Sequence, residues 1–150
     1  MADGPSLRAR AFAMLARREH GRVELGRKLA RYAEESDDVP SLLDDLERSG
    51  YLSDERVAEQ IARRHAGRHG PLRVARDLEA RGVRAVDIEA VVSAAREAEP
   101  AQALQVLRRK FPEPPEDATG YARQGRYLAN RGFSPDVIRR VLRPRPAPDD

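Results

Sequence analysis

Apolar side chains recur three and four residues apart along most of the chain, with charged residues between them. Leu25, Leu29 and Tyr32 share one helical face, and Val137 and Val141 share another. Faces of this kind are buried against neighbouring helices. Because Ala and Leu dominate the apolar residues and aromatic residues make up only 5%, the composition also favours helices over strands. The pattern predicts an all-α protein with nine helices, at 7–18, 22–33, 39–48, 53–66, 72–81, 86–96, 101–110, 118–131 and 135–142.

Two motifs repeat along the chain. An apolar residue followed by a basic cluster occurs at 15–18, 61–64 and 107–110, with a constant offset of 46 residues, and closes the first helix of each unit. A leucine followed four residues later by glycine and an apolar residue occurs at 46–51, 78–83 and 128–133. Glycine at this place takes the left-handed conformation that ends a helix in a Schellman motif. A repeat of this length predicts tandem copies of one helical unit.

These motifs divide the chain into three three-helix repeats. We expect the repeats at residues 7–50, 51–98 and 99–143, with disordered ends at 1–6 and 144–150. The hydroxyl of Ser53 and the Ser134-Pro135 pair mark helix starts. The first repeat lacks the glycine stop between Arg31 and Asp38, and the proline-rich segment 112–117 interrupts the last repeat as a stiff connector. The three copies are therefore not interchangeable.

Charge is balanced over the whole chain but not along it. There are 28 Lys and Arg against 25 Asp and Glu, a net charge of +3. Residues 7–33 carry eight cations against two acids, 34–55 one against nine, and 56–84 eight against three. Local basic patches are therefore expected, although a positive field over the whole surface is excluded.

Ten arginines are candidates for contact with acidic protein surface or nucleic-acid phosphates. They are Arg17, Arg18, Arg63, Arg64, Arg68, Arg73, Arg108, Arg109, Arg139 and Arg140. The alternative is that these side chains only solvate the helices and complement the negative C-terminal ends of the helix dipoles. Both interpretations stay open for each residue.

The sequence offers no residues for catalysis, a metal or a cofactor. It has no cysteine, so disulfides and thiolate sites are excluded. His65 and His69 have a zinc-ligand spacing but no third ligand, and the acidic clusters at 34–38 and 44–47 lack the calcium-loop pattern. No phosphate-binding glycine loop or nucleophile elbow is present. The first residues also lack the regions of a signal peptide, and no apolar run could span a membrane, so we expect a cytoplasmic binding protein.

The motifs resemble those of the bacterial RecX proteins, regulators of the RecA recombinase, over residues 7–143. The most specific stretch comprises Gly50, Tyr51, Leu52 and Asp54, followed by Arg64, Gly70, Pro71, Leu78 and Gly82. The segments 16–29 and 107–111 and the Arg131-Gly132-Phe133 turn support it. Val57 stands where the family usually has Phe, and Gly21 where it often has Ser.

This resemblance implies both a fold and a role. The fold is an elongated, curved, right-handed or solenoid-like array of three three-helix repeats. Independently of the resemblance, we expect a monomer. The role is binding of the RecA–DNA filament and inhibition of its ATPase, strand-exchange and coprotease activities, and hence regulation of DNA repair, recombination and the SOS response. We expect the protein to lie in the filament groove and bridge subunits.

Two other functions fit the residues. One is a helical module that binds DNA directly, which the balanced net charge and the scarcity of aromatic residues disfavour. The other is a helical scaffold for an unrelated protein, which only the family resemblance disfavours.

Overall fold

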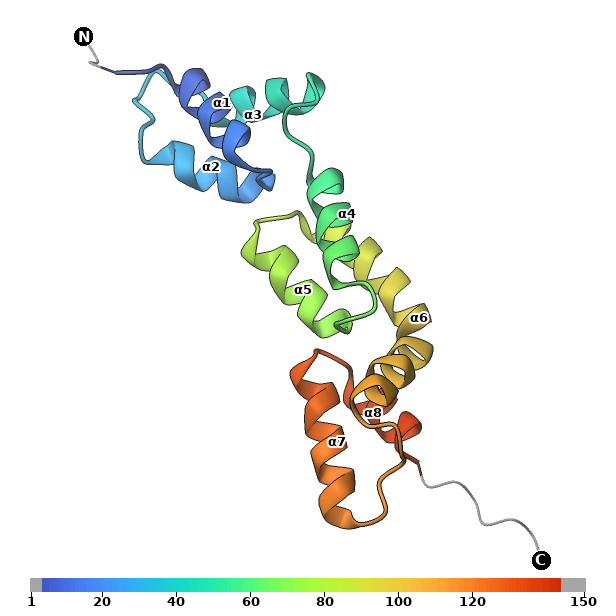
Figure 1. Cartoon of the computed structure of the whole chain (residues 1–150). Coiled ribbons are helices and arrows are strands. Elements are labelled where there is room, and N and C mark those ends of the chain that lie inside the picture. The colour runs from blue at the N-terminus through green and yellow to red at the C-terminus, as the bar shows by residue number, and fades with distance from the viewer. Residues whose placement is uncertain (1–3, 144–150) are drawn as a thin grey trace, which may run out of the picture. The chain divides into compact units, whose positions relative to one another are not determined.

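The computed structural model describes residues 4–143, and the regular secondary structure in this part of the chain is all α-helix. Its eight helices are α1 (Leu7–Arg17), α2 (Arg22–Ala30), α3 (Val39–Arg48), α4 (Asp54–His65), α5 (Pro71–Ala80), α6 (Ala85–Lys110), α7 (Ala118–Asn130) and α8 (Pro135–Val141) (Figure 1). No strand occurs between residues 4 and 143, so the all-α prediction is confirmed. The tail predicted to be disordered at 144–150, and residues 1–3 of the predicted N-terminal tail, lie outside the described residues.

The prediction of two separate helices at 86–96 and 101–110 was wrong. A single helix, α6, runs for 26 residues through Pro100. A proline removes one backbone hydrogen bond and is unfavourable in a helix interior by roughly 3 kcal/mol. Here it is flanked by strong helix formers, five alanines between residues 94 and 103, and no glycine stop precedes it. The carboxylate of Glu99, just before the proline, is buried and accepts from the backbone amide of Ser134, which ties α6 to the residue before α8.

All three glycine stops are confirmed. Gly50, Gly82 and Gly132 have φ of +80°, +67° and +87°. In each turn the amide after the glycine donates to the carbonyl of the leucine five residues earlier, at 3.0 Å in the first turn and 3.2 Å in the other two. This is the Schellman pattern. The predicted helix starts are also present, because the Ser53 hydroxyl accepts from the amide of Arg56 and Pro135 is the first residue of α8.

The chain folds into two compact units, and the division passes through α4, α5 and α6. Unit 1 takes the described residues up to Ala62 together with Asp77–Val91, and unit 2 takes Arg63–Arg76 together with the described residues from Val92 onward. The core of unit 1 comprises Ala11, Leu25, Leu29, Leu42, Leu43, Leu46 and Leu52. The core of unit 2 comprises Ala103, Val106, Leu107, Leu128, Phe133, Val137 and Leu142. The predicted repeat boundaries remain a prediction, and the one after residue 98 falls inside α6.

Within unit 1, the start of α2 docks against the glycine turn that follows α5. The amide of Gly21 donates to the carbonyl of Arg81 at 3.2 Å, and the amide of Val23 donates to the carbonyl of Gly82 at 3.1 Å. These bonds satisfy α2 amides that have no partner inside their own helix. A Cβ on Gly21 would lie 2.5 Å from the carbonyl oxygen of Arg81 and closer still to that of Gly82. Only glycine fits at this contact.

A buried carboxylate completes the junction in unit 1. Asp54, the first residue of α4, is 7% exposed. Its Oδ1 accepts from the amide of Arg22 at 2.7 Å, and its Oδ2 accepts from the amide of Arg84 at 2.8 Å. The Asp54 side chain thus links the first residue of α2 to the residue just before α6.

Unit 2 contains the same junction about fifty residues further along. The amide of Gly70 donates to the carbonyl of Arg131 at 2.7 Å, and the amide of Leu72 donates to the carbonyl of Gly132 at 3.0 Å. The buried carboxylate is Glu99, which accepts from the amide of Ser134 at 2.7 Å. Since Pro71 has no amide hydrogen, Glu99 has one backbone donor where Asp54 has two. The repetition of this bonding scheme confirms the tandem-repeat fold.

Candidate partner-binding surface

The two units carry opposite net charge. In unit 2, the described residues include fifteen Lys and Arg against six Asp and Glu, a net charge of +9. In unit 1 they include twelve Lys and Arg against sixteen Asp and Glu, a net charge of −4. The nearly neutral total therefore conceals a strongly basic unit and an acidic one. A charge difference of this size steers association with charged partners.

The turn between α4 and α5 is the centre of the basic charge in unit 2. Residues 63–76 contain five arginines and no acid. The Arg109 guanidinium donates to the carbonyl of Gly67 at 3.3 Å, and the Arg131 guanidinium donates to the carbonyl of Arg68 at 3.3 Å. The backbone of Arg73 lies against Gly132. We call Arg68, Arg73, Arg109 and Arg131 the basic turn surface. Its four residues come from four separate segments of the chain.

The other predicted arginines are placed individually by the structure. Arg63 and Arg64 end α4 and are exposed, while the half-buried Arg108 donates to the carbonyl of Phe111 at 3.2 Å. On α8, Arg139 pairs with Asp136 and Arg140 is exposed. Across residues 4–143, five of the ten predicted arginines form neither an ion pair nor a side-chain hydrogen bond and so are available to a partner: Arg17, Arg63, Arg64, Arg68 and Arg140.

In unit 1, a buried histidine contacts the backbone of Arg18 in the predicted pair Arg17 and Arg18. His20 is 2% exposed. Its Nδ1 lies 3.0 Å from the carbonyl of Arg18, and its Nε2 lies 3.0 Å from the ammonium of Lys28. A neutral ring that donates from Nδ1 and accepts at Nε2 satisfies both contacts. Arg18 in turn pairs with Glu24 at 2.7 Å. The network fixes the backbone at the end of α1.

Burial lowers the pKa of His20 below its usual 6.5, although the carbonyl of Arg18 acts in the opposite direction. As pH falls below 6.5, the unfolded chain takes up a proton that the folded chain resists, so the free energy of unfolding should decrease with falling pH. We expect urea midpoints to drop between pH 7.5 and pH 5.5, and to drop less in His20→Gln. An equal drop in both proteins would contradict this assignment.

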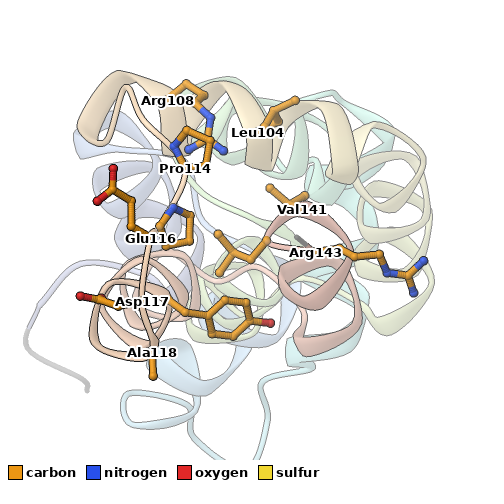
Figure 2. A pocket seen from close by; sticks show the side chains of 11 residues that line it. Leu104, Arg108, Pro114, Glu116, Asp117, Ala118, Val141 and Arg143 are labelled. Carbon is orange, nitrogen blue, oxygen red and sulfur yellow. The ribbon is translucent and has the colours of Figure 1, made fainter. Parts of the chain in front are cut away.

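A groove in unit 2 lies between the C-terminal part of α6, the proline-rich connector, the start of α7 and the end of α8. It has a volume of about 990 Å³. Figure 2 shows Leu104 and Arg108 on one side, Glu116 and Asp117 on the connector, and Val141 on α8. Its walls are mixed in charge and hold no group of acids, histidines or nucleophiles arranged for catalysis. The predicted connector thus forms one wall of the groove.

The described part of the chain contains no cluster of three or more His, Cys, Asp or Glu able to hold a metal. The Nδ1 atoms of His65 and His69 are 2.8 Å apart and their rings are edge to face, so the two residues do meet across the end of α4. Between residues 4 and 143, no helix is long and apolar enough to span a membrane.

Sequence reasoning missed the structural roles of three residues in the two units. Glu99 bonds Ser134, Arg131 reaches the α4–α5 turn, and Gly21 closes the first junction. The signal for Arg131 was present, because an arginine precedes the glycine in two of the three stops. Nothing in the sequence marks Glu99 as buried.

Known proteins resemble the chain over most of its length. The family models for the second and third three-helix domains of RecX match residues 53–92 and 97–142. The regulatory protein RecX of Herbaspirillum seropedicae is 45% identical over 137 residues, which is 91% of this chain and 89% of that protein. The regulatory protein RecX of Leptothrix cholodnii is 43% identical over 138 residues, covering 92% and 88%.

Solved structures share the fold. The crystal structure of RecX from Lactobacillus salivarius matches with a TM-score of 0.74 at 17% identity, over 91% of this chain and 92% of that one. A second crystal structure of a regulatory protein RecX matches with a TM-score of 0.68 at 19% identity, over 90% of this chain and 70% of that one. At these identities the likeness concerns the fold alone.

Proposed function

The chain belongs to the RecX family of regulatory proteins, as its motifs predict, and on this premise we propose that it binds the RecA–DNA filament in the cytoplasm and inhibits its activities. The proposal covers the filament's ATPase, strand exchange and coprotease functions. The protein acts by binding and has no reaction of its own.

One observation carries the proposal: a basic unit and an acidic unit in a single chain, with exposed arginines free of ion pairs. DNA phosphates and acidic protein side chains would bind the first unit, and basic protein side chains would bind the second. Unpaired arginines bind carboxylates and phosphates without first breaking an internal ion pair. Charge complementarity then sets the register and the rate of binding.

Tandem repeats suit a polymeric partner. In a repeat array each repeat contacts only its neighbours, so the array presents side chains along an extended surface. A molecule with three repeats can contact more than one subunit of a filament. Bridging subunits in this way would oppose filament growth and the subunit motions that accompany ATP hydrolysis.

Reversing the charge of Arg63 and Arg64 tests the proposal. Both side chains are exposed at the end of α4 and make no ion pair within residues 4–143, so Arg63→Glu/Arg64→Glu should fold normally. We expect the concentration that half-inhibits RecA ATPase on single-stranded DNA to rise by about tenfold or more, the equivalent of about 1.4 kcal/mol or more.

The matched control is Arg27→Glu/Arg31→Glu on α2 and in the turn after it. It changes the net charge of the chain equally but alters exposed arginines of the acidic unit. It should inhibit nearly as well as the unmodified protein. Full inhibition by the folded Arg63/Arg64 variant would remove these residues from the proposed surface, and no inhibition by the unmodified protein would refute the proposed function.

The acid-free stretch 63–76 favours one alternative, direct binding of DNA by unit 2. Binding through phosphates weakens steeply with salt, with a slope of roughly −0.9 per phosphate neutralised on duplex DNA. A salt titration on naked DNA separates the two functions. Tight binding with a steep slope in the absence of RecA would favour the DNA-binding module.

A further inference from the structure

The second helices of the three repeats share a glycine that is placed differently in the last repeat. Gly21 and Gly70 directly precede α2 and α5, whereas Gly120 is the third residue of α7. The equivalence of these glycines follows from burial, because the residues four and eight positions after each are buried: Leu25 and Leu29, Val74 and Leu78, and Gln124 and Leu128. Helix α7 therefore begins one turn earlier than α2 and α5.

The amide of this glycine has a different partner in the last repeat. Gly21 donates to the carbonyl of Arg81 and Gly70 donates to the carbonyl of Arg131, each in the turn of the following repeat. Gly120 donates instead to the side-chain Oδ1 of Asp117, at 2.7 Å. Asp117 is the N-cap of α7. Its carboxylate thus stands where the carbonyl of a following repeat stands in the two internal junctions.

The space beside Gly120 is also filled by residues of the connector, where a following repeat fills the space beside Gly70. A Cβ on Gly70 would lie 2.5 Å from the carbonyl oxygen of Gly132. A Cβ on Gly120 would instead meet the Asp117 carboxylate at 3.1 Å and the Cβ of Pro115 at 3.5 Å. The connector residues that line the groove in Figure 2 therefore pack where a fourth repeat would place its glycine turn.

The opposite end of the array lacks the complementary half of the junction. After α2, the positions where the other turns have Arg-Gly are taken by Arg31 and Tyr32, and no residue there has positive φ. The Tyr32 ring also packs under the Arg10 guanidinium, 4.0 Å from its ring centre. A second copy of the chain has no free glycine turn at this end to offer to α7.

We propose that Pro115–Thr119 is an end cap, which takes on α7 the place of a following repeat's glycine turn and prevents a fourth repeat or a second copy of the chain from docking there. Three repeats is then a length set by the chain itself, because internal bonds close the last junction. The missing glycine turn after α2 and the proline-rich connector before α7 then have one cause, because neither end of the array has a neighbouring repeat.

The unmodified chain provides the first test. Gly120→Ala should leave the urea midpoint unchanged or raise it, because no backbone carbonyl lies beside the added methyl, whereas Gly70→Ala should lower the midpoint clearly. Asp117→Ala should speed hydrogen exchange at the Gly120 amide by about fivefold, since a lost N-cap costs roughly 1 kcal/mol. A midpoint loss in Gly120→Ala as large as that in Gly70→Ala would overturn the proposal.

A chain with a fourth repeat provides the second test. This chain consists of residues 1–134 joined directly to residues 85–150, so the segment 85–134 occurs twice. A second α6 then begins at the position where α8 begins in the unmodified chain. In one version the first copy of the connector is unchanged. In the other version, residues 112–119 of the first copy are replaced by the Gly-Arg-His sequence found at 67–69. We expect the second version to unfold in one calorimetric transition at a higher temperature, and the first to show a separate, weaker transition for the added repeat.

Docking of the added repeat is then tested at Gly120 of the first copy. Gly120→Ala should destabilise only the chain with the replaced connector, because only there does a glycine turn pack on this residue. Equal destabilisation in both chains, or failure of the added repeat to dock in either, would show that the connector is not what closes the array.

Discussion

Gly132→Ala should destabilise the protein by about 2–5 kcal/mol. Part of this arises from φ of +87°, since an alanine in the left-handed conformation costs roughly 1–2 kcal/mol. The larger part arises from docking, because a Cβ at this position would lie 2.6 Å from the amide nitrogen of Arg73 and closer still to its Cβ. Overpacking of this kind costs about 1–3 kcal/mol. Urea unfolding followed by circular dichroism measures the total.

Gly50→Ala separates the two contributions. Gly50 occupies the same position of the same turn, with φ of +80°, but no atom would lie within 4 Å of a Cβ added there. Gly50→Ala should lose only the conformational part, about 1–2 kcal/mol. Gly125→Ala in α7 should be neutral or slightly stabilising, because its Cβ would make ordinary contacts at 3.7 and 3.8 Å. Equal losses in Gly132→Ala and Gly50→Ala would show that the junction does not depend on close backbone approach.

The helices and their stops could be predicted because the signals for them are local. A Schellman turn needs a glycine and an apolar residue at fixed places, and all three copies are formed as the sequence predicts. A break at Pro100 was predicted wrongly because the unfavourable effect of the proline on the helix was outweighed. Residues 94–103 favour helix, and the buried Glu99 is tied to Ser134, 35 residues away.

The arginines of the candidate surface were predictable as a set, but their arrangement was not. Clusters at helix ends follow from the 46-residue spacing, which says nothing about which clusters meet. Arg109 and Arg131 come together at the α4–α5 turn through bonds to the carbonyls of Gly67 and Arg68. Those bonds depend on the docking of the glycine turn on α5, a contact between residues some sixty positions apart. Sequence periodicity carries no information on such a contact.

The two carboxylates in the junctions occupy different places in their helices, because Asp54 begins α4 whereas Glu99 lies inside α6. First-turn acids are usually attributed to the helix dipole. Asp54, in the first turn of α4, instead accepts from backbone amides outside its own helix, as Glu99 does from inside α6, and the two residues are 7% and 3% exposed. Their position is therefore a consequence of stacking, and their substitution should affect the contact between repeats more than the helix that carries them.

Asp54→Ala should lower the free energy of unfolding by about 3–6 kcal/mol, because two hydrogen bonds to a charged acceptor are lost. The substitution leaves the amides of Arg22 and Arg84 without the oxygens that lie 2.7 and 2.8 Å away. Losing a charged acceptor costs roughly 1.5–3 kcal/mol per hydrogen bond. Hydrogen exchange should quicken at these two amides first, and urea unfolding measures the total loss.

Two comparisons make the test specific to the junction. Glu55→Ala removes an exposed acid from the same first turn of α4 and should lose only about 0.5 kcal/mol, the helix-dipole contribution. Glu99→Ala should lose less than Asp54→Ala, because Pro71 has no amide hydrogen and Ser134 is the one backbone donor to Glu99. If Asp54→Ala costs no more than Glu55→Ala, the carboxylate does not hold the repeats together. A loss in Glu99→Ala equal to that in Asp54→Ala would mean that the number of backbone donors does not set the strength of the junction.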